Sequence, residues 1–252
     1  MIQPLSIPPS ICYTTQSNKI LMRKLMTKTL LTAHSGCDGT QDNSLTYIAY
    51  ALALNADCLE LDIRKDQNGA LVLNHDDGPA HAMLADAFLQ LKNHPEKKLN
   101  CDLKQEGLEL ETYSLAKQMG VAGQIVFSGT VSKDAASVKP DIFHLVPWFV
   151  NIELLFPEIK AMGLTEAVKA LGAIPMADTI QAFIQDNGAC CLNTHHSIAK
   201  TPLYKELMAR GVSLSVWTPD DEQVIRGFLA DAVYNITTRN AKRACEIRKE
   251  QS

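Results

Sequence analysis

The chain has 252 residues, of which 46% are hydrophobic and 21% are charged, a composition typical of globular proteins. Its net charge of −4 at pH 7 predicts no electrostatic binding to nucleic acid or to an anionic membrane. No apolar stretch approaches the roughly 18 residues of a membrane span, and the seven cysteines show no C-x-x-C spacing. We therefore expect a cytoplasmic protein with no transmembrane segment, reduced thiols, no disulfide framework and no zinc site.

The N-terminal segment differs in character from the rest of the chain. Residues 1–27 contain three prolines and no continuous apolar run, so they do not resemble a signal peptide. We expect them to form a disordered extension, or to lie upstream of a natural start at Met22 or Met26. Residues 28–252 are expected to form one folded domain, because α/β barrels of this length are commonly single domains.

Within this domain, short apolar runs typical of strands alternate with longer segments typical of helices. The expected strands are 28–34, 58–63, 70–75, 98–104, 124–128, 141–147, 188–195, 213–218 and 232–238. The expected helices are 44–56, 81–94, 108–120, 131–138, most of 152–187, 202–211, 221–230 and 239–250. Ser44 is the expected N-cap of its helix, and Gly120 and Gly211 are the expected C-caps of theirs.

This alternation of strands and helices predicts a parallel sheet. When the hairpin at Asn68-Gly69 is counted with its parent strand, eight strand–helix units remain, which favours an α/β fold of the (β/α)8 TIM barrel type. The hairpin would then form a small β-hairpin extension after the second strand. An open, doubly wound sheet is the competing fold, but its first turn should carry G-x-G-x-x-G, and the turn here reads AHSGCDGTQDNS.

Two acids alternate with apolar residues in the second strand, LELDI. Residues two apart in a strand face the same side, so Glu60 and Asp62 share one face and the aliphatic residues share the other. The aliphatic face suits packing beneath helices, which directs the two carboxylates into the barrel. Carboxylates this close must be solvated, protonated or neutralised by a cation, and Mg²⁺ or Ca²⁺ prefers such oxygen ligands.

The hairpin that follows is expected to return a histidine to the same face. Asn68-Gly69 is the preferred pair for a two-residue turn. That turn would place His75 directly opposite Asp62, and directly paired residues point to the same side. A slip of one residue in the register would remove this relationship.

The third parallel strand, LNCDLK, repeats the pattern, with Asp102 and Lys104 on one face. His34 ends the first strand. Because barrel active sites lie at the carboxyl ends of the strands, these side chains and those of the second strand are expected to meet there. Three carboxylates, two histidines and a lysine suit metal-assisted phosphodiester cleavage with general acid and base catalysis.

At this point the sequence resembles the glycerophosphodiester phosphodiesterase family. The family pattern runs His-Arg-Gly, Glu-Asn-Thr, Glu-Leu-Asp, a hairpin ending in His-Asp, and then Glu-x-Lys. The corresponding residues here are His34-Ser35-Gly36, Asp42-Asn43-Ser44, Glu60-Leu61-Asp62, His75-Asp76 and Asp102-Leu103-Lys104. Segment 211–243, which contains Trp217, is similar to the family's closing pattern. The resemblance spans nearly the whole domain and is weak over 130–190.

The resemblance implies a TIM barrel that hydrolyses a small-molecule glycerophosphodiester to glycerol 3-phosphate and an alcohol. It implies one divalent cation, Mg²⁺ or Ca²⁺, held by Glu60, Asp62 and Asp102. The histidines His34 and His75 would act as general acid and base. For substrate binding, the resemblance implies that Lys104 helps to hold the phosphate and that Trp217 walls the pocket.

This sequence departs from the family pattern in places that keep other functions open. Ser35 stands where the family has an arginine, and serine cannot replace its two-pronged grip on phosphate. Asp102 and Asp42 each replace a longer glutamate. One alternative is therefore a relative that binds a phosphorylated ligand without turnover. Another is a metal-free lyase on the same barrel, against which the three clustered acids argue.

Overall fold

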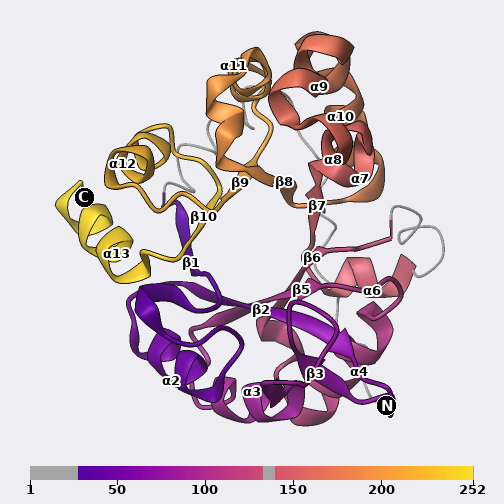
Figure 1. Ribbon diagram of the computed structural model, residues 1–252, viewed down its shortest axis with the longest axis vertical. Coiled ribbons are helices and arrows are strands. Elements are labelled where there is room, and N and C mark those ends of the chain that lie inside the picture. The colour runs from indigo at the N-terminus through magenta and orange to yellow at the C-terminus, as the bar shows by residue number, and fades with distance from the viewer. Residues whose placement is uncertain (1–27, 133–139, 252) are drawn as a thin grey trace, which may run out of the picture.

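The structure, a computed structural model, describes residues 28–132 and 140–251. Within these ranges, eight parallel strands surround a central axis, and helices surround the strands (Figure 1). The parallel strands are β1 (Leu30–Ala33), β2 (Cys58–Lys65), β5 (Lys98–Leu103), β6 (Ile125–Gly129), β7 (Phe149–Asn151), β8 (Cys191–His195), β9 (Leu214–Trp217) and β10 (Asn235–Thr238). The predicted (β/α)8 barrel is confirmed.

The strands follow one another around the ring in chain order. β1 pairs with both β2 and β10, which brings the first and last strands of the barrel together. The seam between β6 and β7 is held by an isolated parallel bridge between Phe127 and Trp148, where Phe127 N donates to Pro147 O at 3.0 Å. All eight carboxyl ends therefore open on the same side, where barrel active sites form.

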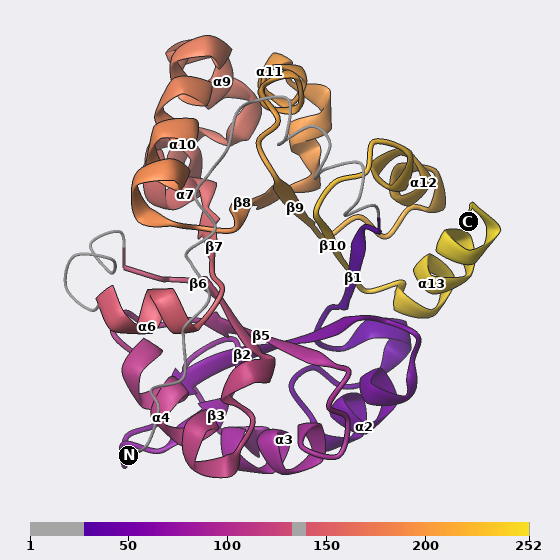
Figure 2. The same ribbon diagram turned by 180° about the vertical axis from the view of Figure 1, so that it is seen from behind.

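The outer layer is helical, as the view from behind also shows (Figure 2). Its helices are η1 (Cys37–Gly39), α2 (Leu45–Ala53), α3 (Leu84–Leu91), α4 (Glu109–Met119), η2 (Ala122–Gln124), α6 (Pro140–Leu145), α7 (Ile152–Leu155), α8 (Glu158–Met162), α9 (Leu164–Leu171), α10 (Ala173–Asn187), η3 (His196–Lys200), α11 (Pro202–Arg210), α12 (Glu222–Ala230) and α13 (Ala241–Glu250). The predicted caps are confirmed: Ser44 Oγ accepts from Tyr47 N at 3.0 Å, and Gly120 and Gly211 end α4 and α11 in the left-handed conformation.

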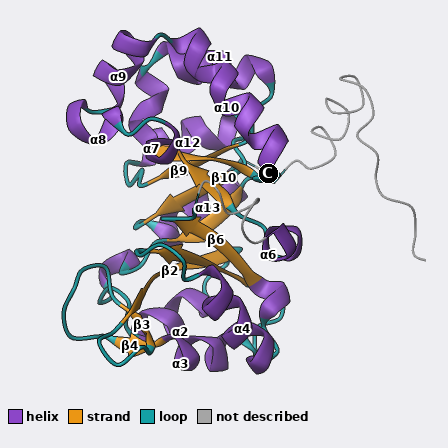
Figure 3. Cartoon of the chain, turned by 90° about the vertical axis from the view of Figure 1, so that its right-hand side faces the viewer, coloured by secondary structure: helices purple, strands orange, loops and turns teal. Residues whose placement is uncertain are grey.

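The predicted hairpin extension is present, but its predicted register was wrong by one residue. β3 (Leu71–Leu73) pairs antiparallel with the end of β2, and a short β4 (Ala82–Met83) pairs with β3, beside α2 and α3 (Figure 3). Ile63 pairs with Leu73, and Asn74 N donates to Asp62 O at 3.1 Å. Asn74, not His75, therefore lies opposite Asp62.

The turn chemistry explains this slip. The loop is longer than a two-residue turn, because Asp66 N donates to Ala70 O and closes three residues between them. Asp66 Oδ1 also accepts from Asn68 N at 2.9 Å and from Ala70 N at 2.8 Å. An aspartate that caps its own turn favours this longer loop over the Asn-Gly turn that we had expected.

Strand alternation separates two environments, as predicted. On β2, Leu59, Leu61 and Ile63 face outward, are at most 2% exposed and join the large apolar core beneath the helices. The opposite face points into the barrel. There Thr32, Asn235 and Ser215 form a buried hydrogen-bonded chain, with Thr32 Oγ1 donating to Asn235 Oδ1 at 2.8 Å. The inside of the barrel is thus lined by polar side chains, and the acids of β2 share this inward face.

One predicted strand was wrong. Segment 141–147 was expected to be a strand, but Pro140–Leu145 forms α6, and the strand β7 follows at Phe149. Short apolar runs fit either structure, and periodicity alone does not separate a buried strand from a helical segment. His144 is exposed on α6.

Two other expectations lie outside the described residues. These are the extension 1–27 and most of the helix expected at 131–138. Among the described residues, no single helix has the length and apolar composition to cross a membrane. The helices α9 and α10 meet the length and composition only when they are counted together, and they are sharply bent relative to each other.

Candidate active site

Three carboxylates meet inside the mouth of the barrel. Glu60 and Asp62 come from β2 and Asp102 from the neighbouring β5, where Asp62 and Asp102 are register partners. Each offers an oxygen within 4.8 Å of the others. Glu60 and Asp62 are 3% and 4% exposed, so little water screens their repulsion. We call Glu60, Asp62 and Asp102 the acid cluster.

A single lysine side chain bridges two of these acids. Lys104 Nζ lies 2.9 Å from Asp62 Oδ1 and 2.7 Å from Asp102 Oδ2. It follows β5, two residues after Asp102, and so shares its face. One ammonium cannot neutralise three carboxylates, so the cluster retains an excess of negative charge when all three are ionised.

Two further oxygens of the acid cluster are held by the loop after β1. Ser35 N donates to Glu60 Oε2 at 3.0 Å. Asn43 holds Asp62 at two points: its Nδ2 donates to Asp62 Oδ2 at 2.8 Å, and its Oδ1 accepts from Asp62 N at 3.0 Å. Ser35 in turn accepts from Asn43 N at 2.7 Å through its Oγ. These bonds fix the carboxylates in place before any ligand arrives.

The pKa values of the cluster follow from this arrangement. Burial, together with the charges of Asp62 and Asp102, raises the pKa of Glu60 well above its usual value. Burial also raises the pKa of Asp102. At Asp62, burial is outweighed by Lys104 and by the hydrogen bond from Asn43, and the pKa is lowered. Asp102 and Asp62 raise the pKa of Lys104 despite its burial, so this side chain stays an ammonium.

The cluster fits a divalent cation. Its ligands are carboxylate oxygens, which hard cations prefer, and they converge from two strands. Asp102 Oδ1 is buried and has no hydrogen-bond partner among the residues that the structure describes. A buried carboxylate oxygen without a donor is costly, and a cation would satisfy it. These residues could therefore hold a metal ion.

His34 lies at the edge of the cluster. Its Nδ1 is 2.8 Å from Ser35 O and 3.8 Å from Glu60 Oε2. A carbonyl oxygen only accepts, so Nδ1 carries the proton in this bond and Nε2 is left as the basic nitrogen of the neutral ring. Burial lowers the pKa of His34, which favours that neutral form.

His75 lies farther from the acids than the sequence suggested. It follows the end of β3, and its side chain is 63% exposed. Its Nδ1 is 2.9 Å from Asp76 Oδ1, while its charge still contributes to lowering the pKa of Asp62. Arg64, which shares the inward face of β2, holds this segment: it donates to His75 O at 3.2 Å and pairs with Asp77.

Trp217 occupies the opposite side of the mouth. It ends β9, is half-buried, and lies edge-on to His195 at the end of β8, with ring centroids 5.1 Å apart. His195 ends the expected strand 188–195 and could from that place reach the mouth, where barrels carry functional side chains. We nevertheless interpreted it as a loop histidine and not as a ligand, and its pairing with Trp217 has no local signal in the sequence.

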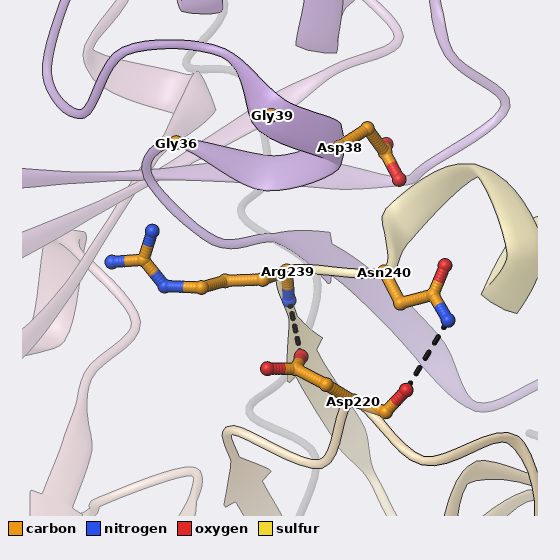
Figure 4. Close-up of a pocket in the computed structure, with 6 residues that line it drawn as sticks. All are labelled: Gly36, Asp38, Gly39, Asp220, Arg239 and Asn240. Carbon is orange, nitrogen blue, oxygen red and sulfur yellow. Dashed lines mark hydrogen bonds between the residues drawn. The ribbon is translucent and has the colours of Figure 1, made fainter.

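Arg239 is a further cation at the mouth of the barrel, which the sequence pattern placed only at the start of the expected helix 239–250. Its guanidinium donates to both oxygens of Asp42, at 2.9 and 2.8 Å. It lines an open pocket of about 350 Å³ between the loops that follow β1, β9 and β10 (Figure 4). The pocket residues are Gly36, Asp38, Gly39, Asp220, Arg239 and Asn240.

Comparison with models of known protein families finds no match, and neither does comparison with curated protein sequences. Solved structures do match. A glycerophosphodiester phosphodiesterase from Parabacteroides distasonis is 16% identical with a TM-score of 0.64, over 89% of this chain and 98% of that one. One from Thermotoga maritima is 15% identical with a TM-score of 0.61, over 87% and 98%.

A third structure is an Oleispira antarctica phosphodiesterase in complex with the product sn-glycerol-3-phosphate. It is 16% identical, with a TM-score of 0.62 over 88% of this chain and 97% of that one. The chain has the glycerophosphodiester phosphodiesterase fold. The likeness covers nearly the full length of these enzymes, and at this level of identity it establishes the shared fold while the chemistry rests on the site.

Proposed function

We propose that this protein hydrolyses glycerophosphodiesters to glycerol 3-phosphate and an alcohol, and that the reaction depends on a divalent cation. The observation that carries the proposal is the acid cluster, with Lys104 and His34 beside it, at the carboxyl ends of the strands. The shared fold supports the same reaction class. A cytoplasmic location goes with it, in keeping with the six free cysteines among the described residues.

Glu60, Asp62 and Asp102 would hold the cation, with Mg²⁺ or Ca²⁺ as the ions suited to oxygen ligands. A bound divalent cation supplies Lewis-acid polarisation of a phosphoryl oxygen and stabilises negative charge in the transition state. The protein's part is to present the three carboxylates in a fixed arrangement. The bonds from Ser35 N and Asn43 Nδ2 do this for Glu60 and Asp62.

His34 is assigned as the general base. Its Nδ1–H is engaged with Ser35 O, so Nε2 is free to take a proton from the attacking oxygen. That oxygen belongs either to water or to a neighbouring hydroxyl of the substrate. Analysis of early products for a cyclic phosphate separates the two routes.

His75 is assigned as the general acid. Its Nδ1 bonds to the Asp76 carboxylate, which leaves Nε2 to exchange a proton with the leaving alkoxide. Lys104 adds positive charge where the phosphate gains negative charge in the transition state. Trp217, with its ring against His195, is assigned as the wall for the organic part of the substrate.

The test is an assay for glycerol 3-phosphate released from glycerophosphocholine, with Mg²⁺ or Ca²⁺ and with a chelator. We expect release that needs the cation and that falls at least about a hundredfold in His34→Ala. His94→Ala, which removes an exposed histidine on the outside of the barrel, serves as the matched control. Turnover that persists in chelator would favour a metal-free lyase instead.

A second function, binding of a phosphorylated ligand without turnover, is favoured by one observation. The register of the hairpin sets Asn74 opposite Asp62 and leaves His75 largely exposed. Without an acid at the leaving group, catalysis would fail while binding survived. Calorimetry with glycerol 3-phosphate, run beside the assay, separates the two: binding with no release under either cation favours the binder.

A further inference from the structure

His34 and Arg239 occupy equivalent places on neighbouring strands. β1 and β10 are parallel partners, and their last paired residues are Ala33 and Thr238. His34 and Arg239 each come next in the chain, and His34 N donates to Thr238 O at 3.0 Å. Arg239 therefore enters the mouth of the barrel beside His34, although the two are 205 residues apart in sequence.

The backbone of Arg239 is fixed from both sides. Its N donates to Asp220 Oδ1 at 2.8 Å, and its O accepts from Asp38 N at 2.7 Å. The side chain extends away from Asp38, Asp220 and Asn240 and passes beneath Gly36 (Figure 4). Because both backbone groups of Arg239 are hydrogen-bonded, the direction in which its side chain leaves the backbone is fixed, and this limits the positions of the guanidinium.

Gly36 leaves the space that the guanidinium needs. A Cβ at Gly36 would lie 1.7 Å from Asp42 Oδ1 and 2.9 Å from Arg239 Nη1, and its φ of +73° also favours glycine. The pair of Arg239 and Asp42 thus packs directly on the backbone two residues after His34. This close approach is built into the turn that carries His34.

The guanidinium keeps donors for another acceptor. Arginine has five N–H donors, and the fork to Asp42 uses one on each terminal nitrogen. The other three have no partner among residues 28–132 and 140–251. The fork is the main cause that raises the pKa of Arg239, and the Glu60 carboxylate adds to it, so the cation is within electrostatic reach of the acid cluster.

We propose that Arg239 binds the phosphate of the substrate, with its free N–H groups on the non-bridging oxygens, and that Asp42 positions it. This inference rests on the proposed function. Two of the three N–H groups of Lys104 are engaged by Asp62 and Asp102, whereas Arg239 keeps three donors. A planar guanidinium suits two phosphate oxygens at once. It also supplies the two-pronged group that Ser35, buried and bonded to Asn43 N, cannot.

The experiment compares Arg239→Ala with Asp42→Ala. Both remove the same exposed ion pair, but only the first removes the guanidinium. The readouts are the affinity for inorganic phosphate and for glycerol 3-phosphate by calorimetry, kcat and KM for glycerophosphocholine, and Tm. Arg243→Ala, which removes an arginine paired to Glu222 and Glu250 on the outer helices, is the control.

We expect Arg239→Ala to weaken both ligands about ten- to a hundredfold and to lower kcat/KM by a similar factor. Asp42→Ala should keep most of the phosphate affinity, and both variants should melt close to wild type. Equal losses in the two variants would mean that the pair is only a structural tie and would overturn the inference. Wild-type turnover with unchanged ligand affinity in Arg239→Ala overturns the inference alone. A wild-type chain that neither binds nor hydrolyses overturns the proposed function as well.

Discussion

The Lys104 ammonium lies 2.9 Å from the Asp62 carboxylate of the neighbouring strand. This contact links side chains from the two strands that supply the acid cluster, because the same ammonium also bonds to Asp102 of β5. Lys104 thus compensates part of the negative charge that a divalent cation would neutralise more fully. Lys104 therefore holds two of the carboxylates in place and still leaves negative charge that a cation can neutralise.

Replacing Lys104 with methionine should therefore damage both stability and activity. With the ammonium gone, three buried carboxylates repel one another, so the metal-free variant should melt several degrees below wild type. Turnover of glycerophosphocholine should fall at least about a hundredfold, as for loss of an oxyanion-stabilising group. Kinetics and thermal melts with and without Ca²⁺ measure these effects. Lys98→Met, at the exposed start of β5, is the control and should change neither.

The stabilisation that a cation gives should grow with pH. The pKa of Glu60 is raised by burial and by its neighbours, so in the metal-free fold it keeps its proton above the usual 4.5. The folded state then binds more protons than the unfolded one, and stability is lost as pH rises from about 4.5 towards the raised pKa. A cation must displace that proton, which becomes easier at higher pH.

Melts with and without saturating Ca²⁺, at about pH 5.5 and about pH 8, measure this effect. The increase in Tm should be larger at the higher pH. Glu60→Gln has no proton to displace at this position, so its cation response should be smaller and flatter with pH. A wild-type response that does not vary across this range would contradict the assignment of Glu60 as a ligand.

Arg64 should matter for catalysis through the segment that it holds. It bonds to His75 O and pairs with Asp77, so Arg64→Ala should loosen this segment and lower kcat about tenfold, with less change in KM. Hydrogen exchange over residues 74–83 should speed up in parallel. Lys65→Ala, which breaks an ion pair with Glu111 on the opposite face of β2, is the control. Faster exchange with unchanged kcat would remove His75 from the mechanism.

A separate prediction concerns the amino-terminal end of the barrel. Asp57 accepts from Leu31 N at 2.9 Å and from Arg248, and so ties β1 to α13. Asp57→Asn replaces a charged acceptor by a neutral amide and should cost about 2–3 kcal/mol of unfolding free energy. Because the site lies at the other end, kcat should be unchanged. Lys28→Ala, which removes only the exposed partner of Asp57, should cost less than about 1 kcal/mol.

The difference in stability between wild type and Asp57→Asn should depend on pH. Although burial opposes it, the bonds from Arg248 and Leu31 lower the pKa of Asp57 below its usual 3.8. A carboxyl with a lowered pKa stabilises the fold above its unfolded value and loses that effect as pH falls through the folded value. The gap in stability between wild type and Asp57→Asn, measured by denaturant unfolding, should therefore be full at neutral pH and narrow below about pH 4.

Strand alternation made the barrel and the acid cluster predictable. The order polar–apolar–polar in β2 and β5 fixes which side chains face inward, whatever the details of the loops. Glu60, Asp62 and Asp102 could therefore be assigned to one site from the sequence, and the structure brings their oxygens within 4.8 Å of one another. The prediction of which side chains face inward is reliable because it requires only that the segment forms a strand.

The register of the hairpin and the contacts between distant segments of the chain were less predictable. The position of His75 depended on a turn, and the bonds that Asp66 makes to Asn68 and Ala70 lengthened that turn by one residue. Arg239 lies beside His34 only because β10 pairs with β1 when the barrel closes. A contact between the two ends of a chain has no local signal in the sequence. The apolar run 141–147 was compatible with either a helix or a strand, and most of it belongs to helix α6.

The proposed function depends on the acid cluster being a cation site. The most direct measurement is a crystal grown with Mn²⁺ and glycerol 3-phosphate, examined by anomalous scattering. We expect a single strong peak bounded by oxygens of Glu60, Asp62 and Asp102, which should be absent from crystals of Glu60→Gln grown in parallel. A peak elsewhere, or Lys104 still bridging Asp62 and Asp102 with no metal between the carboxylates at saturating Mn²⁺, would contradict it.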